Sequence, residues 1–391
     1  MVDSFNFSKL PEIYFGTGSI RKAVWLVRRY GKNILLVTGK SSFSNSKWGR
    51  RLLDEFDASG IRYDIISISG EPVTTFIDRT AEGFRKMHPD VVVAAGGGSV
   101  IDTGKALAAM IPVDGRVWDY LEGNPDQKQH PGTSLPFMAL PTTSGTGSEA
   151  TKNAVLSTTG DNVVKRSLRH DNFIPDVAII DPELSAGCPP AVTAASGLDA
   201  VTQLLEGYLS TRSSPITDAL ALSGLAAGLG SLRRVYHSGD DISARSDMAY
   251  AALLSGIVLA NAGLGAIHGF ASVLGGHYQI PHGIICGTLL GTVTRTNINK
   301  LKAAGENGIS WKKYSQAGRK LSGLHAGRDD HYVYFLADEL DRLIDELQMP
   351  RLGQYGITRE DTAGLADETD IKNNPVNLDK DELQAILDSR L

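Results

Sequence analysis

The chain has 391 residues, 42% of them hydrophobic, and its 44 acidic and 39 basic side chains give a net charge of −5. This acidic balance argues against a nucleic-acid partner, and the two cysteines, Cys188 and Cys286, are too few for a disulfide scaffold or a four-cysteine metal site. No apolar run reaches the roughly 18 residues of a membrane span and no apolar core follows the acidic N-terminus, so we expect a cytoplasmic protein without a membrane partner.

Up to about residue 185, short β-rich runs alternate with stretches whose apolar residues recur at helical spacing. The predicted strands are 33–39, 63–69, 90–95 and 137–140, and the predicted helices are 19–29, 48–59, 75–87 and 100–110. Because the strands are apolar at nearly every residue, we expect a parallel sheet covered by helices on both faces. Residues 153–159 and 163–169, around Thr159-Gly-Asp-Asn162, predict a hairpin beside that sheet.

After Asp181-Pro182 the composition changes, because Ala, Leu and Gly dominate and helical periodicity continues to the end of the chain. Residues 248–294 contain no Asp, Glu, Lys or Arg, which predicts buried helices at the centre of a second domain. We therefore expect a dinucleotide-binding α/β domain over 1–185 and an all-helical domain over 186–391. A cleft between two such domains is the default place for a ligand.

Two loops rich in small residues follow predicted strands. Gly96-Gly-Gly-Ser99 opens a helix, where free backbone N–H groups and the helix dipole suit a pyrophosphate, although it is not the GxGxxG fingerprint. An ordinary tight turn is the alternative. Pro141-Thr-Thr-Ser-Gly-Thr-Gly-Ser-Glu149 offers hydroxyls and amides that suit a ribose and phosphates, and its alternative is a solvent-exposed loop.

Possible metal ligands gather in the helical half. Asp199 and Gln203 are four residues apart and share one helix face, and three of the nine histidines lie at His268, His277 and His282. Imidazoles and one carboxylate suit Zn²⁺ or Fe²⁺, while histidines satisfied within the core are the alternative. Cys286 follows His282 by four residues, but its apolar neighbours favour a small core residue over a thiolate ligand.

These segments together resemble the iron-containing (group III) alcohol dehydrogenase family over nearly the whole chain. The resemblance rests on Tyr14-Phe-Gly-Thr-Gly18, Gly96-Gly-Gly-Ser-Val-Ile-Asp102, Pro141–Glu149, Asp176–Leu184, Gly197-Leu-Asp-Ala200, His268-Gly-Phe-Ala271, Leu274-Gly-Gly276, Pro281-His-Gly283 and Asn373-Asn-Pro375. It implies a Rossmann-like N-terminal domain, a helical C-terminal domain and a divalent metal beside a nicotinamide. It further implies hydride transfer between NAD(P)(H) and an alcohol or aldehyde, and a homodimer paired around Glu12–Gly16.

The family's metal ligands are an Asp, a His four residues later, and two further His fourteen apart. Asp199, His268 and His282 match, but Gln203 stands at the second position, so the resemblance implies a bound but weaker metal. Many members carry a proton-relaying histidine where this chain has Ser272. We expect His277 to act as the general acid or base instead, beside the catalytic Asp199, His268 and His282. A histidine that is only hydrogen-bonded inside the helical domain is the alternative for His277.

The resemblance also implies a coenzyme site. The residues carried over to it are Gly97, Gly98, Ser99, Asp102, Thr142, Thr143 and Lys165. NAD-preferring relatives have an Asp at the end of the strand 33–39, where this chain has Gly39, followed by Lys40 and Ser41. Without the acid a 2′-phosphate is not repelled, so we expect NADP(H) to be preferred over NAD(H).

The sequence therefore predicts an NAD(P)-dependent alcohol dehydrogenase or aldehyde reductase assisted by Fe²⁺ or Zn²⁺. Gln203 and Ser272 keep open a metal-independent carbonyl reductase, similar to the maleylacetate reductases of the same superfamily. A nucleotide-binding protein that has lost catalysis is a third hypothesis. The physiological alcohol or aldehyde is left open.

Overall fold

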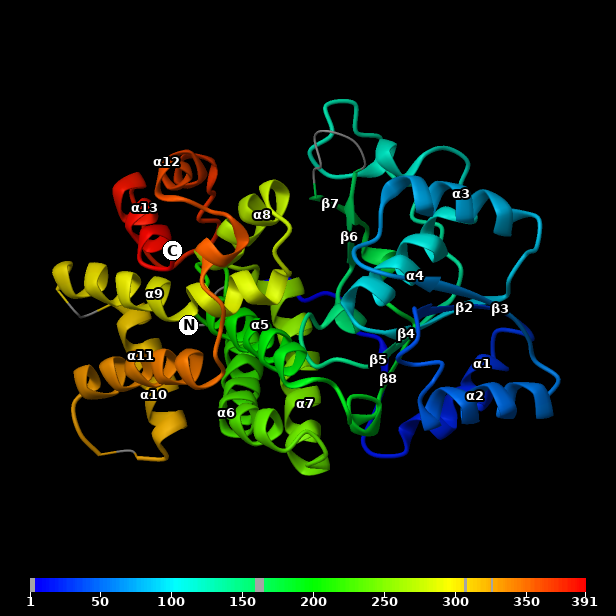
Figure 1. Cartoon of the computed structure of the whole chain (residues 1–391), viewed down its shortest axis with the longest axis horizontal. Helices are drawn as coiled ribbons and strands as arrows, with labels where there is room; N and C mark the ends of the chain where they lie inside the picture. Colours follow the sequence, from blue (N-terminus) through cyan, green and yellow to red (C-terminus); the bar gives the residue numbers. More distant parts are fainter. Residues whose placement is uncertain (1–3, 159–164, 306–307, 325) are drawn as a thin grey trace. The chain divides into compact units, whose positions relative to one another are not determined.

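The computed structural model describes residues 4–158, 165–305, 308–324 and 326–391. Its internal contacts divide it into two compact units. One comprises Ser8–Cys188, and the other comprises Pro189–Leu391 with the N-terminal residues up to Phe7. Within the described residues, all strands lie in the first unit, and the second is built from helices (Figure 1).

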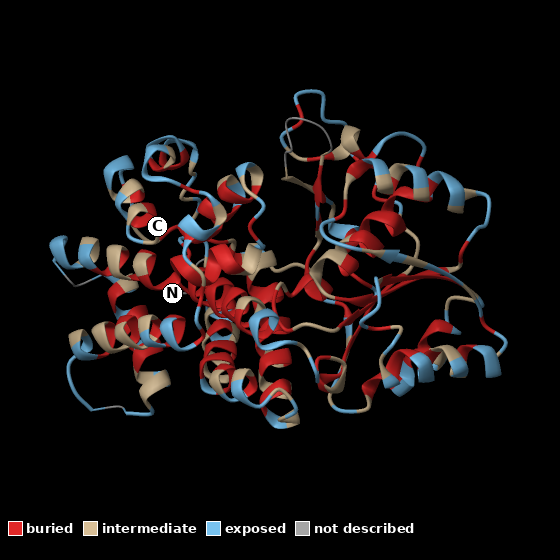
Figure 2. Ribbon diagram, in the orientation of Figure 1, coloured by how far each residue is buried: buried red, intermediate tan, exposed pale blue. Residues whose placement is uncertain are grey.

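The Ser8–Cys188 unit is built on a six-stranded parallel sheet with the order β1-β8-β5-β4-β2-β3. Its strands are β1 (Glu12–Phe15), β2 (Asn33–Gly39), β3 (Arg62–Ile68), β4 (Val91–Gly96), β5 (Phe137–Pro141) and β8 (Val177–Ile180). The three neighbouring strands β2, β4 and β5 are buried along nearly their whole length (Figure 2). This burial agrees with their almost continuous apolar sequence, because such strands are covered on both faces.

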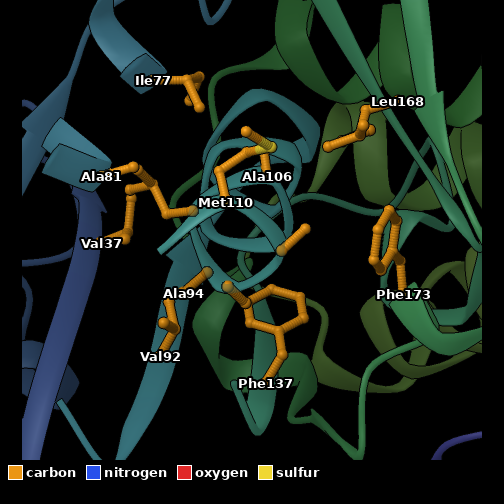
Figure 3. Packing of buried hydrophobic residues seen from close by; sticks show 14 of the residues in the cluster. Val37, Ile77, Ala81, Val92, Ala94, Ala106, Met110, Phe137, Leu168 and Phe173 are labelled. Atoms are coloured by element: carbon orange, nitrogen blue, oxygen red, sulfur yellow. The ribbon is translucent and has the colours of Figure 1, made fainter. Parts of the chain in front are cut away.

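Helices cover the two faces of the sheet. They are α1 (Ala23–Val27) and α2 (Lys47–Ala58) on one face, and α3 (Thr74–Arg85) and α4 (Gly98–Met110) on the other. Successive residues of a strand point to opposite faces. Leu36 of β2 therefore joins the core under α2, whereas Val37 joins the core under α4. Figure 3 shows this second core, where side chains of the sheet and of α3 surround α4; it includes Val37, Ile77, Ala81, Val92, Ala94, Ala106, Met110 and Phe137.

The remaining segments of this unit are short. The predicted hairpin is present as the antiparallel pair β6 (Asn153–Ser157) and β7 (Lys165–Arg169), while its turn at Thr159–Asn162 lies outside the described residues. The single-turn helices are η1 (Ser19–Lys22), η2 (Val117–Tyr120), η3 (Ser148–Ala150), η4 (Asp171–Phe173) and η5 (Pro182–Leu184). The predicted helix 19–29 is instead η1, which follows the left-handed Gly18, and the short α1, which ends at Val27.

The second unit consists of helices, as predicted. They are α5 (Pro190–Leu209), α6 (Pro215–His237), α7 (Ile242–Ala262), α8 (Ala266–His277), α9 (His282–Ala303), α10 (Ile309–Ser322), α11 (Asp329–Glu346), η6 (Leu352–Tyr355), α12 (Arg359–Glu368) and α13 (Lys380–Asp388). The uncharged segment 248–294 runs through α7, α8 and the first half of α9, and most of its residues are buried. An α/β unit followed by a helical unit confirms the predicted fold class.

Two helices of the described chain, α6 and α7, are long and apolar enough to cross a membrane by length and composition alone. In α7, 67% of the most apolar 18-residue stretch is buried within the protein, and α7 packs against α5 and α6. Core helices of soluble proteins pass the same test, so this feature is weak evidence for a membrane span.

Candidate functional site

Three helices of the second unit bring four ligand-type side chains together. Asp199 comes from α5, His268 from α8, and His282 and Cys286 from the first turns of α9, and one ligand atom of each lies within 4.8 Å of all the others. Oδ1 of Asp199 lies 3.5 Å from Nε2 of His268 and 3.6 Å from Nε2 of His282. The structure thus unites three of the predicted metal ligands and adds a cysteine that we expected to be only a core residue.

Two oxygen atoms at this cluster are buried without a hydrogen-bond partner among the described residues. They are Oδ1 of Asp199, which is 1% exposed, and Oε1 of Gln203, which is 2% exposed. A buried oxygen left unpaired costs about 1–3 kcal/mol. A divalent cation held by the cluster would satisfy Oδ1 of Asp199, and carboxylate, imidazole and thiolate are the donors that Zn²⁺ takes in proteins. The residues present therefore fit a metal ion.

Glycines let α9 approach α5 closely enough to form the cluster. A Cβ atom on Gly283 would lie 2.4 Å from the carbonyl oxygen of Ala195, and one on Gly287 would lie 2.9 Å from Cδ1 of Leu198. Each glycine follows a cluster residue directly, namely His282 or Cys286. The close helix contact therefore brings both side chains beside Asp199.

Glu206 holds His268 in the orientation that a metal ligand needs. Its Oε2 lies 2.6 Å from Nδ1 of His268, and its Oε1 accepts a hydrogen bond of 2.7 Å from the backbone N–H of Ile267. Because a carboxylate can only accept, Nδ1 of His268 carries a proton. Loss of the second ring proton, at Nε2, would then leave the lone pair of that atom facing the cluster. We did not single out Glu206 from the sequence, although Asp199, Gln203 and Glu206 follow the i, i+4, i+7 pattern of one helix face.

The cluster is electrostatically suited to a cation. Burial by itself would raise the pKa of Asp199, but the neighbouring His282, His268 and Gln203 side chains lower it below the usual value. Burial would likewise lower the pKa of His268, yet the charge of Cys286 and hydrogen bonds to Asp199, Cys286 and Glu206 raise it well above the usual value. Negative charge at the centre of the cluster thus favours a bound positive charge.

His277 lies apart from this cluster. It is the last residue of α8, its side chain is half-exposed, and its Nε2 lies 2.8 Å from Oε2 of Glu368. Ser272, at the family's histidine position, donates to the carbonyl oxygen of His268, and Nζ of Lys372 donates to both groups at 2.9 and 3.2 Å. The structure therefore does not unite His277 with Asp199, His268 and His282.

In the first unit, the predicted coenzyme residues lie at the carboxyl ends of three neighbouring strands. Gly39 ends β2 beside the end of β4, and β4 leads into Gly97–Ser99 at the start of α4. Thr142, after β5, donates its backbone N–H to the carbonyl oxygen of Gly96 at 2.9 Å. Because α2 and α4 cover opposite faces, β2 and β4 flank a switch in the winding of the sheet, where open α/β folds bind ligands.

The two small-residue loops pack directly on each other. A Cβ atom on Gly98 would lie 2.8 Å from Cγ2 of Thr146, and one on Gly97 would lie 3.2 Å from Oγ1 of Thr143. No side chain caps the start of α4, so its first N–H groups are available to an anion. Loop packing therefore favours glycine at both positions, most strongly at Gly98.

A buried lysine that we did not single out fixes the second loop to α4. Nζ of Lys105 donates to the carbonyl oxygens of Ser148 at 2.9 Å and of Thr151 and Asn153 at 2.8 Å. Burial lowers the pKa of Lys105 to about 8. The sequence could have pointed to Lys105, because it is the one basic residue in the mostly small and apolar run 98–110.

Two of the remaining predicted coenzyme residues, Asp102 and Lys165, have hydrogen-bond or ion-pair partners within the protein. Asp102 accepts hydrogen bonds from the hydroxyl of Ser148 and from the backbone N–H of Val155, so it fixes the loop and the hairpin to α4. Lys165 forms an ion pair of 2.6 Å with Glu71. Lys40, Ser41 and Ser42 are exposed directly after β2.

Comparison with known proteins places this geometry in a family. The model of the iron-containing alcohol dehydrogenases matches residues 11–182, and the model of the C-terminal part of the Fe-containing alcohol dehydrogenase family matches residues 193–391. Alcohol dehydrogenase 4 of Saccharomyces cerevisiae is 33% identical over 385 residues, which cover 96% of each chain. The NADPH-dependent butanol dehydrogenase of Clostridium saccharobutylicum is 30% identical, covering 98% of this chain and 97% of that one.

A solved structure shows the same fold. The sulfoacetaldehyde reductase of Bifidobacterium kashiwanohense, in complex with NAD⁺, is 29% identical, covers 99% of each chain and superposes with a TM-score of 0.86. Together with the family models, which match nearly the whole chain, this similarity identifies the protein as an oxidoreductase that acts on CH–OH groups. The chain belongs to the iron-containing alcohol dehydrogenase family.

Proposed function

We propose that this enzyme interconverts an alcohol and an aldehyde using NADP(H) in preference to NAD(H), with a divalent metal held by Asp199, His268 and His282. The observation that carries the proposal is the buried, unpaired Oδ1 of Asp199, which lies 3.5–3.6 Å from the Nε2 atoms of both histidines. The oxygen of Gln203, which is also buried and unpaired, assists as a weaker donor.

The protein's own groups prepare the site for this chemistry. When bound, the metal supplies a Lewis acid that polarises the substrate oxygen. Glu206 fixes the proton of His268 at Nδ1 and leaves Nε2 free to coordinate. Gly97, Gly98 and Ser99 would bind the pyrophosphate at the start of α4, and Thr142 and Thr143 would line the coenzyme groove. Asp102 would position the loop 141–149 beside the coenzyme, because it accepts a hydrogen bond from the hydroxyl of Ser148 in that loop.

The coenzyme preference rests on the end of β2. Gly39 provides no carboxylate for a ribose 2′-hydroxyl, and the exposed Lys40 and Ser41 offer a cation and a hydroxyl to a 2′-phosphate. One relative is named as NADPH-dependent, whereas the similar reductase structure holds NAD⁺, so the preference must be measured for this chain. We expect a lower KM for NADPH than for NADH. Gly39→Asp should reverse the order, and a lower KM for NADH in the unmodified enzyme contradicts the proposal.

We propose His277 as the general acid or base, with Lys165 near the coenzyme. The contact between His277 and Glu368 supports this role, because a carboxylate on one ring nitrogen orients the other. His277→Ala should lower kcat and leave the affinity for NADPH unchanged. Unchanged turnover would exclude the role.

The two units correspond, in this proposal, to a dinucleotide-binding domain over 1–185 and a metal- and substrate-binding domain over 186–391. We further propose a cytoplasmic homodimer that pairs along β1, an edge strand of the sheet. Glu12 and Gly16 donate their N–H groups to β8, so the N–H of Ile13 points to the open edge. Ile13→Pro should therefore yield a folded monomer in light scattering, and a dimer that persists would place the interface elsewhere.

The experiment that tests the proposed function is metal content per chain together with NADPH-coupled aldehyde reduction. The protein is prepared anaerobically without chelator or a nickel column. About one equivalent of iron or zinc, with activity lost on chelation and restored by metal, supports the proposal. Aldehyde reduction by metal-free protein would instead favour the metal-independent carbonyl reductase, and NADPH binding without any reduction would favour a protein that has lost catalysis.

A further inference from the structure

We propose that Cys286 is the fourth strong metal ligand of this enzyme, in the place that Gln203 leaves without an imidazole. This inference rests on the proposed metal site at Asp199, His268 and His282. It changes the expected ligand set to one carboxylate, two imidazoles and one thiolate.

The distances within the cluster match those between donors around one tetrahedral ion. With metal–donor distances of about 2.0–2.3 Å, nitrogen and oxygen donors lie about 3.4 Å apart, and sulfur and nitrogen donors about 3.6 Å apart. Sγ of Cys286 lies 3.7 Å from Nε2 of His268 and 3.6 Å from Nε2 of His282. The same two nitrogens lie 3.5 and 3.6 Å from Oδ1 of Asp199. Both imidazole nitrogens therefore lie at the distances of shared metal ligands from the sulfur as well as from the carboxylate oxygen.

Helix geometry explains why Cys286 reaches this position. His282 and Cys286 are four residues apart on α9 and so share one face, and the glycine after each allows that face to approach α5. Cys286 is fully buried, as is Asp199 on the facing helix. The sulfur thus points into the space that Asp199 and the histidines enclose.

Gln203 is better placed to support Asp199 than to complete the ligand set. It lies one turn after Asp199 on α5, and both side chains are buried on the same face of that helix. The atom of Gln203 that could bind a metal is Oε1, a neutral amide oxygen. Such an oxygen binds Zn²⁺ and Fe²⁺ more weakly than a thiolate or an imidazole does. Gln203 is therefore a positioning residue for Asp199 in this arrangement.

A thiolate ligand has two chemical consequences. Cys286 would release its thiol proton to solvent when the metal binds, so binding of the ion is accompanied by proton release. Thiolate also favours zinc over iron more strongly than oxygen or nitrogen donors do. We therefore expect this member of an iron-named family to discriminate more strongly for zinc than its Cys286→Ser variant does.

The test is X-ray absorption and cobalt substitution of the full-length protein, with Cys188→Ser as the matched control. The zinc form should show one sulfur at about 2.3 Å, and the cobalt form should show a thiolate-to-cobalt charge-transfer band in the near ultraviolet. Both signals should persist in Cys188→Ser and Gln203→Ala and vanish in Cys286→Ser. Zinc affinity should fall at least tenfold in Cys286→Ser, and the ratio of zinc to iron affinity should fall with it.

The outcomes separate this inference from the proposed function. A metal bound by nitrogen and oxygen donors alone, with the same affinity in Cys286→Ser, overturns the role of Cys286 and leaves the metal-dependent function standing. Protein that binds neither zinc nor cobalt overturns both. If Cys286→Ser fails to fold, which thermal melting shows, the sulfur shell and charge-transfer band of the unmodified and Cys188→Ser proteins still decide between a thiolate and its absence.

Discussion

Glu206→Gln should weaken metal binding although it changes only one atom of a side chain that does not touch the metal. The carboxylate of Glu206 accepts from the backbone N–H of Ile267 at 2.7 Å and from Nδ1 of His268 at 2.6 Å. A glutamine has one acceptor oxygen and one donor nitrogen, so it can satisfy only one of these groups. If the oxygen stays on His268, the amide nitrogen meets the N–H of Ile267 and a buried donor is left unpaired.

If the oxygen stays on Ile267 instead, the amide donates to Nδ1 of His268. The neutral ring then carries its proton at Nε2, the atom that should face the metal. Loss of such a supporting contact lowers metal affinity about 10–100-fold, which is about 1.4–2.8 kcal/mol. Either arrangement of the glutamine therefore leads to weaker binding.

The assay is competition for zinc between the protein and a chromophoric chelator, with thermal melting to confirm that the variant is folded. Glu368→Gln is the matched control, because Glu368 also contacts a histidine, His277, at 2.8 Å but away from the cluster. We expect Glu368→Gln to bind zinc as the unmodified protein does. Equal affinities of Glu206→Gln and Glu368→Gln would refute the reasoning.

Three further predictions concern the first unit. Lys105→Met removes hydrogen bonds to three backbone carbonyl oxygens, at about 1–3 kcal/mol for each oxygen left unpaired; the loss is partly offset because no ammonium is buried and because Thr151 still donates to the oxygen of Ser148, so urea denaturation should show a loss of about 2–4 kcal/mol. A loss under about 1 kcal/mol would show that water replaces the lysine. Burial raises the pKa of Glu149 from 4.5 to about 7, so the free energy of unfolding should fall as pH rises between these values. Glu149→Gln cannot ionise and should gain up to about 3 kcal/mol over the unmodified protein across that window; a difference that is the same at pH 4.5 and pH 8 would contradict the burial of this carboxyl. Gly98→Ala should raise the KM for NADPH, because its Cβ would force Thr146 away, whereas Gly83→Ala, with open space around it, should leave that KM unchanged. Equal KM values for the two variants would show that the loop adapts.

Local features of the sequence were sufficient to predict four strands of the six-stranded sheet, but not its strands β1 and β8. The run 33–39 is a strand because its residues are apolar and β-branched and end in glycine, and β2 has these bounds. Spacing was also sufficient to place Asp199 and Gln203 on one helix face, because a helix repeats every 3.6 residues whatever surrounds it. The sequence also offered His268, His277 and His282 as candidate ligands, and the resemblance selected His268 and His282 by their spacing of fourteen residues.

What the tertiary structure decided is which distant side chains meet. Glu206 and His268 are 62 residues apart, and Lys105 lies 48 residues from Asn153 along the chain, yet each pair forms a hydrogen bond. Cys286 has apolar neighbours in sequence, and only the packing of α9 against α8 and α5 brings its sulfur to His268 and Asp199. The physical reason is that periodicity fixes the face on which a residue lies, whereas the partner of that face depends on how the helices pack against one another.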